Sequence, residues 1–134
     1  MPAGIRIFLI EDDADDIELL EVSLKDNSVV YHMDVVMEGD KVKDYIKNCN
    51  TLPHVIVMDF NLPRVHGREI MKEIKANDNF RNIPLIVLTT STAKEDVEYS
   101  YKMGADSFIT KPTTIQGFNA TVGTIVQLAT INSP

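Results

Sequence analysis

Five short apolar runs, separated by segments with a helical pattern, constrain the fold of this chain more than any other feature. The third and fourth runs, residues 54–59 and 84–89, are almost continuously apolar. Strands of a parallel sheet that is covered on both faces have this composition. The other runs cover residues 5–10, 30–36 and 106–110. Strict alternation of strand and helix predicts a parallel sheet with right-handed crossovers, and therefore a (βα)5 domain of the α/β class.

The segments between the runs change to the 3.6-residue period of a helix. The last segment shows it most clearly, because its apolar residues form a single stripe: Ile115, Phe118, Val122, Ile125, Val126 and Ala129. Two further patterns, Thr92 with Glu95 and Thr113 with Gln116, predict capping boxes at the starts of the fourth and fifth helices.

Length and charge limit the classes of protein to consider. The 134 residues fit one domain, and we expect residues 1–134 to form it, with a core of about 4–130 and no output domain. The net charge of −7 and the lack of a long basic run argue against nucleic acid or an anionic membrane as a partner. No apolar run is long enough to span a bilayer, and the single cysteine excludes an internal disulfide. We therefore expect a cytoplasmic protein.

Polar residues stand at the carboxyl ends of the predicted strands. Glu11 and Asp12 follow the first strand, Asp59 ends the third, Thr89 ends the fourth and Lys111 follows the fifth. Ligands of open α/β sheets bind at this edge, so we expect these side chains to converge there.

The residue types at this edge suit phosphoryl chemistry. Carboxylates from neighbouring strands are the hard ligands that Mg²⁺ prefers, and a carboxylate beside Mg²⁺ can attack a phosphoryl group. Lys111 would add positive charge and Thr89 a hydroxyl donor. A plainer alternative makes Asp59 and Lys111 a buried ion pair. With either interpretation of Asp59, we expect acids such as Asp15 and Asp16 to lie in the first turn of a helix, where the helix dipole favours negative charge.

Four motifs carry a family resemblance in the right order: IEDD, VMDFNLP…HG, PLIVLTTS and GADSFITKP. The chain resembles the receiver domain of two-component response regulators over most of its length. Within that chemotaxis-receiver-like family it is similar to stand-alone regulators paired with phytochrome-type histidine kinases. The resemblance implies a flavodoxin-like, doubly wound three-layer fold with a five-stranded parallel sheet of order 2-1-3-4-5.

The resemblance also implies a phosphoacceptor and its metal site. Asp59 takes the position of the aspartate that a histidine kinase phosphorylates. Asp12 corresponds to a direct Mg²⁺ ligand together with Asp59, and Glu11 to an acid that acts partly through water. Asn61 occupies the position whose backbone carbonyl binds the metal.

Other positions correspond to the switch of the family. Thr89 matches the switch hydroxyl, Phe108 the switch aromatic residue and Lys111 the lysine that contacts the phosphoryl group. The resemblance implies a cis Lys111–Pro112 bond. Gly67 stands in the loop after the third strand, where we expect a positive φ.

The function implied is that of a single-domain response regulator of a phosphorelay. Such a regulator accepts a phosphoryl group from a sensor histidine kinase and changes a protein-binding surface, and the resemblance implies a kinase of phytochrome type. It is not an enzyme beyond self-catalysed phosphorylation and dephosphorylation. The partner is then a downstream protein, or a second copy bound through the fourth helix, the strand at 106–110 and the last helix. The alternative is a relay intermediate that passes the phosphoryl group on.

Three other classes fit less well. A haloacid-dehalogenase-like phosphatase needs Asp-x-Asp, but here Asp59 is followed by Phe60 and Asn61. A flavodoxin proper needs hydroxyls and glycine after the first strand, whereas Glu11 and Asp12 would repel the FMN phosphate. A pseudo-receiver would lack the acceptor, the lysine or the acidic pair.

Overall fold

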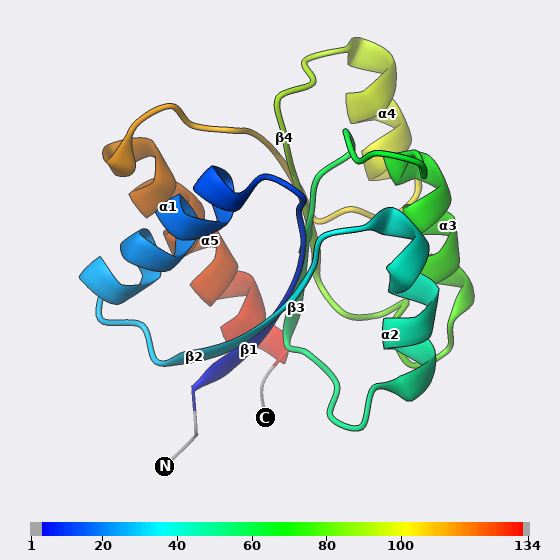
Figure 1. Ribbon diagram of the computed structural model, residues 1–134, viewed down its shortest axis with the longest axis horizontal. Coiled ribbons are helices and arrows are strands. Elements are labelled where there is room, and N and C mark those ends of the chain that lie inside the picture. The colour runs from blue at the N-terminus through cyan, green and yellow to red at the C-terminus, as the bar shows by residue number, and fades with distance from the viewer. Residues whose placement is uncertain (1–3, 133–134) are drawn as a thin grey trace.

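The computed structural model describes residues 4–132 of the chain, as an alternation of strands and helices (Figure 1). The elements in chain order are β1 (Ile5–Ile10), α1 (Ala14–Asp26), β2 (Tyr31–Val36), a 3-10 turn η1 (Gly39–Lys41), α2 (Val42–Asn48), β3 (Val55–Met58), α3 (Gly67–Ala76), β4 (Leu85–Thr89), α4 (Lys94–Lys102), β5 (Ser107–Thr110) and α5 (Ile115–Asn132). None of these helices is long and apolar enough to cross a membrane.

The strands form one five-stranded sheet of order β2-β1-β3-β4-β5, and every neighbouring pair is parallel. This is the predicted flavodoxin-like topology, which is thereby confirmed. Helices α1 and α5 cover one face of the sheet, and α2, α3 and α4 cover the other (Figure 1). The register pairs Ile10 with Met58 and Thr89 with Thr110, so the ends of these strands lie along one edge.

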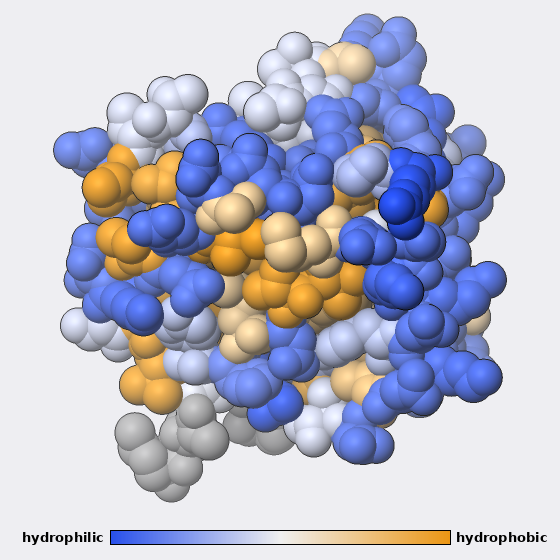
Figure 2. All heavy atoms as spheres, in the orientation of Figure 1, coloured by the Kyte–Doolittle hydropathy of each residue, from blue (hydrophilic) through white to orange (hydrophobic). Residues whose placement is uncertain are grey.

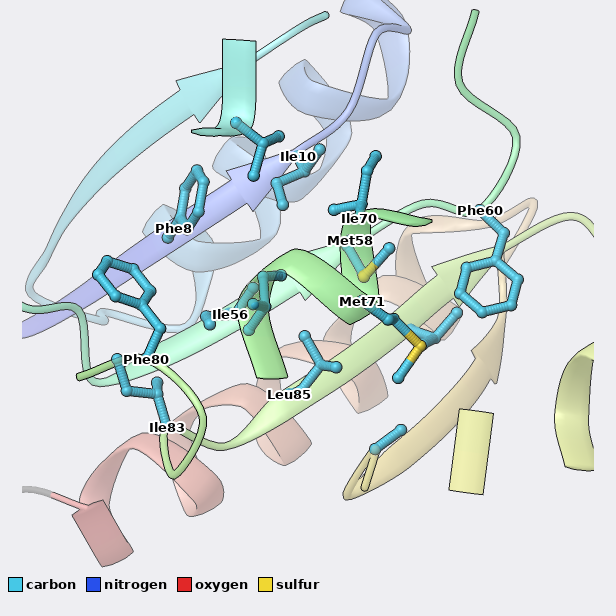
Figure 3. Close-up of a cluster of buried hydrophobic side chains, with 14 residues drawn as sticks. Phe8, Ile10, Ile56, Met58, Phe60, Ile70, Met71, Phe80, Ile83 and Leu85 are labelled. Carbon is cyan, nitrogen blue, oxygen red and sulfur yellow. The ribbon is translucent and has the colours of Figure 1, made fainter. Parts of the chain in front are cut away.

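Two apolar layers hold the sheet between the helices. On the α2–α4 side, Phe8, Ile56 and Met58 pack with side chains of α3 and of the loop before β4 (Figure 3). On the other side, Leu9 and Val57 pack against α1 and α5. Successive strand residues alternate between these two layers, and both layers are buried. This explains why the central strands are continuously apolar in sequence.

The edge strand β2 is less buried than the central strands. Its residues Met33, Val35 and Val36 are only partly covered. Figure 2 shows the molecule from the same side as Figure 1. Apolar side chains gather across the middle of the view, where Figure 1 places β2, and hydrophilic side chains lie to either side. The β2 run is therefore the weakest of the strand patterns, because one side of it faces solvent.

Both predicted capping boxes are wrong. Helix α4 begins after Ala93, whose side chain makes no capping bond, and the Ser91 hydroxyl accepts the N–H of Ala93 itself, before the first turn. At α5, the Gly117 backbone N–H donates to Thr114 Oγ1 at 3.1 Å, and Thr113 is not the capping residue. In both places two hydroxyl residues stand side by side, so the spacing alone did not locate the first turn.

Candidate functional site

A groove at the carboxyl edge of the sheet brings together four of the predicted site residues, Asp12, Asp59, Asn61 and Lys111. It has a volume of about 480 Å³ and is lined by Asp12, Asp13, Ala14, Asp15, Asp16, Asp59, Asn61, Thr90 and Lys111. These residues come from the loops and helix starts that follow β1, β3, β4 and β5. The parallel sheet therefore brings together groups that are up to about a hundred residues apart in sequence.

Lys111 is the centre of the charge network in this groove. Its side chain is 7% exposed, and Nζ lies 2.7 Å from Glu11 Oε1 and 2.8 Å from both Asp16 Oδ2 and Asp59 Oδ2. Burial by itself would lower the pKa of Lys111, but the three carboxylates raise that pKa above its ordinary value. Lys111 is therefore a fixed ammonium group that holds three acids together.

Asp16 is the contact that the sequence did not reveal. It lies in the first turn of α1, as expected, and it also reaches Lys111. The helix start explains both facts. Asp13 is the N-cap, and its carboxylate accepts the backbone N–H groups of Asp15 and Asp16, so the first turn is fixed beside the groove.

Asp59 follows β3 and its carboxyl group is buried. Its side chain is 4% exposed. Burial alone would raise the pKa of Asp59, but hydrogen bonds from the Asn61 backbone, Lys111 and Thr89 outweigh it and hold that pKa below its ordinary value. The Asn61 N–H donates to Oδ1 at 3.0 Å, and Lys111 Nζ donates to Oδ2 at 2.8 Å.

Glu11 and Asp12 complete an acidic triad with Asp59. One carboxylate oxygen from each of these residues lies within 4.8 Å of the others. Burial raises the pKa of Glu11 to about 7, although Lys111 and the Asp13 backbone favour its charged form. Asp12 is exposed to the groove. Oxygen donors with excess negative charge are what a hard divalent cation requires, so the residues present fit such an ion.

Thr89 and Asn61 close the site on the β4 side. The Thr89 side chain is fully buried, and its hydroxyl helps to lower the pKa of the Asp59 carboxyl. Asn61 Nδ2 donates to Thr89 Oγ1 at 3.3 Å and to Thr90 Oγ1 at 3.2 Å. Asn61 thus ties the loop after β3 to the end of β4.

Phe108 lies behind this group and is not part of it. Its ring is partly buried and meets Phe60 edge to face, with centroids 6.3 Å apart. Its backbone N–H donates to Tyr101 Oη at 3.1 Å. Phe108 therefore connects β5 to the core and to α4.

Two backbone expectations are wrong. Residues 4–132 contain no cis peptide bond, so Lys111–Pro112 is trans, the isomer that an X–Pro bond favours by about 0.5–1 kcal/mol. The glycines of positive φ are Gly4 and Gly104, and not Gly67. Gly67 is instead required for space, because a Cβ there would lie 2.6 Å from the Phe60 Cα atom.

The sequence of this chain is similar to those of known regulatory proteins. Response regulator Rcp1 of Synechocystis sp. is 32% identical over 110 residues, which are 78% of this chain and 75% of Rcp1. The probable methanogenesis regulatory protein FilR2 of Methanothrix harundinacea is 28% identical over 120 residues, 87% of this chain and 77% of FilR2.

Solved structures agree with the sequence comparison. The phosphorylated cyanobacterial phytochrome response regulator RcpA superposes with a TM-score of 0.86 at 29% identity, over 98% of both chains. The Mn²⁺-bound form of Rcp1 gives 0.80 at 29% identity, over 90% of this chain and 91% of Rcp1. The model of the response regulator receiver domain matches residues 7–122. The chain therefore belongs to the family of response regulator receiver domains.

Proposed function

We propose that this chain is a phosphorylation-activated receiver whose acceptor is Asp59 and whose phosphoryl donor is a histidine kinase. The observation that carries the proposal is the state of Asp59. It is a buried carboxylate with a lowered pKa, held between Lys111 and an acidic pair at the carboxyl edge of the sheet. A buried acid in such a place is a candidate nucleophile rather than a packing residue.

The chain's own groups then act as follows. An ionised Asp59 oxygen attacks the phosphorus of a phosphohistidine, and the P–N bond breaks with the electron pair going to the imidazole. Lys111 Nζ, which lies 2.8 Å from Asp59 Oδ2, remains beside the transferred group and offsets its charge. The Thr89 hydroxyl, which is buried at the end of β4, donates to a phosphoryl oxygen. The product carries about −1.5 to −2 units of charge.

Asp12, Asp59 and the Asn61 carbonyl would hold the divalent cation, with Glu11 acting through water. Bound there, Mg²⁺ supplies charge neutralisation at the phosphoryl oxygens. Two relatives support a cation at such a site. The structure of Rcp1 is of its Mn²⁺-bound form, and that of the receiver domain of the histidine kinase PA1611 has a magnesium ion in its active site cleft.

The partners follow from the same family. RcpA is described as a phytochrome response regulator, which supports a phytochrome-type kinase as the donor. We place the output surface on α4, β5 and α5, where the Tyr101 and Ile115 side chains are 50% and 46% exposed. A downstream protein or a second copy of the chain would bind there. We also propose that the protein acts in the cytoplasm.

The test is to locate the acyl phosphate chemically. The protein is incubated with Mg²⁺ and phosphoramidate, whose P–N bond resembles that of phosphohistidine. Borohydride then reduces any aspartyl phosphate to homoserine, which peptide mass mapping locates. We expect homoserine at position 59. Homoserine at Asp12 or Asp16 in its place would refute the assignment.

A further inference from the structure

Helix α4 is held in the fold by very few buried side chains. Of its residues Lys94–Lys102, the structure buries Ser100, whose hydroxyl is used within the helix by donating to the Asp96 carbonyl at 2.6 Å. Val97 and Tyr99 are only partly covered. A helix with so little apolar anchoring depends on polar contacts for its position.

One polar network joins the start of α4 to the candidate site. The backbone N–H of Ser91 donates to Thr89 Oγ1 at 3.3 Å, and the Ser91 hydroxyl donates to Asp96 Oδ2 at 2.6 Å. The Thr89 hydroxyl at the carboxyl end of β4 is therefore two hydrogen bonds away from the first turn of α4.

The same carboxylate ties α4 to α3. Arg68 Nη2 donates to Asp96 Oδ1 at 3.1 Å, and the Asp96 side chain is 16% exposed. The Arg68 guanidinium also lies over the Tyr99 ring, with Cζ 4.8 Å from the centroid. Asp96 thus uses one oxygen for Ser91 and the other for Arg68.

This contact leaves two polar atoms unsatisfied. Arg68 Nε and Tyr99 Oη are buried and make no hydrogen bond. Both atoms would gain water as a partner if α4 moved away from α3, so the contact opposes such a move only moderately.

We propose that Arg68, Asp96 and Ser91 form a clamp that holds α4 in the present arrangement, and that phosphorylation of Asp59 works against it. This inference rests on the proposed function. The reason is the position of Thr89. Its hydroxyl accepts the Ser91 N–H and the Asn61 amide at 3.3 Å each, and the Asn61 backbone N–H donates to the Asp59 carboxylate. Phosphorylation places acceptor oxygens beyond that carboxylate. Thr89 moves toward them, which breaks its contact with Ser91 and so disturbs the bond from Ser91 to Asp96.

The clamp has a thermodynamic consequence. A phosphoryl group or its mimic favours the arrangement in which α4 has been released from α3. It binds more tightly when the free energy of that release is smaller, because a ligand shifts an equilibrium by its difference in affinity for the two states. Arg68 and Asp96 are therefore positioning residues, which act on the site through Ser91 and Thr89.

The test compares Asp96→Ala and Arg68→Ala with the wild type and with Glu98→Ala. Glu98 is the control because it lies on the same helix, with its side chain 66% exposed and 3.8 Å from Lys94. Amide hydrogen exchange of residues 94–102 reports on the clamp. Fluorine NMR titration with beryllium fluoride and Mg²⁺ reports on the affinity for a phosphoryl mimic. Thermal unfolding checks that each variant folds, and Arg68→Lys serves as a conservative second variant.

We expect α4 to exchange about fivefold faster in both alanine variants, and the mimic to bind about fivefold more tightly. Glu98→Ala should match the wild type, and Arg68→Lys should fall between. Faster exchange with unchanged or weaker mimic affinity would make the contacts structural only and overturn the proposal, as would unchanged exchange. A wild type that does not bind the mimic would instead contradict the proposed function, and the clamp's link to phosphorylation with it.

Discussion

At the scale of single residues, Lys111 determines the electrostatics of the site. It brings one positive charge to the carboxylates of Glu11, Asp16 and Asp59, and Asp12 adds a further acid nearby. The groove therefore holds more acidic than basic side chains, which favours the binding of a cation.

Removing the ammonium should destabilise the fold. We expect Lys111→Met to lower the free energy of unfolding by about 3 kcal/mol, because breaking a buried pair leaves uncompensated charge. Mg²⁺ should restore part of this loss. Urea denaturation at pH 7 with and without Mg²⁺ measures both, with Lys94→Met as the exposed control. A loss below about 1 kcal/mol for Lys111→Met would show that the carboxylates do not depend on it.

Two glycines should respond in opposite ways to the same substitution. A Cβ at Gly67 would lie 2.6 Å from the Phe60 backbone, whereas a Cβ at Gly123 on α5 would meet nothing within 4 Å. We expect Gly67→Ala to cost about 2 kcal/mol or more through overpacking. Gly123→Ala should gain about 0.5–1 kcal/mol through helix propensity. Thermal and urea unfolding measure the change in unfolding free energy for both variants. Equal changes would contradict the close approach at Gly67.

At the scale of elements, the helix ends are less well predicted by the sequence than the helices and strands themselves. The predicted strand and helix order is correct, because period and burial follow directly from the apolar pattern. The capping hydroxyls, the trans Lys111–Pro112 bond and the reason for Gly67 were not predicted correctly. Each depends on tertiary neighbours, such as Asp96 beside Ser91 or Phe60 beside Gly67, that a local pattern does not specify.

The contact between β2 and α2 gives a prediction of pH dependence. Tyr45 stacks on Phe8 and its hydroxyl donates to Asp34 Oδ2 at 2.8 Å. Burial alone would raise the pKa of Asp34, but hydrogen bonds from Tyr45 and His32 lower it below its ordinary 3.8. A lowered folded pKa contributes stability above the unfolded value, and this contribution is lost as the pH falls through the folded pKa.

Tyr45→Phe keeps the ring and removes that hydrogen bond. We expect the wild type to exceed the variant by about 0.5 kcal/mol in unfolding free energy near neutral pH, an amount that allows for the exposure of Asp34. The difference should shrink below about pH 4. Denaturation series from pH 3 to pH 7 measure it, and a difference that does not change with pH would exclude the Asp34 contact as its source.

At the scale of the whole molecule, topology explains how distant residues share one site. The parallel order β2-β1-β3-β4-β5 places every strand's carboxyl end at one edge, so the positions of Asp12, Asp59, Thr89 and Lys111 could be predicted from sequence. Asp16 and the clamp of Arg68, Asp96 and Ser91 could not. The contact of Asp16 with Lys111 depends on how α1 is oriented about its own axis. The contact of Arg68 with Asp96 depends on how α3 packs beside α4.

Intact mass spectrometry tests most directly whether Asp59 is the phosphoacceptor. The wild type, Asp59→Asn and Asp15→Asn are each incubated with acetyl phosphate, with and without Mg²⁺. Asp15 is a matched control because it is an exposed acid of the same groove with no contact to Lys111 among those the structure gives. We predict the mass of one phosphoryl group on the wild type and on Asp15→Asn, only with Mg²⁺, and none on Asp59→Asn. A phosphoryl group on Asp59→Asn, or none on the wild type, would contradict the account.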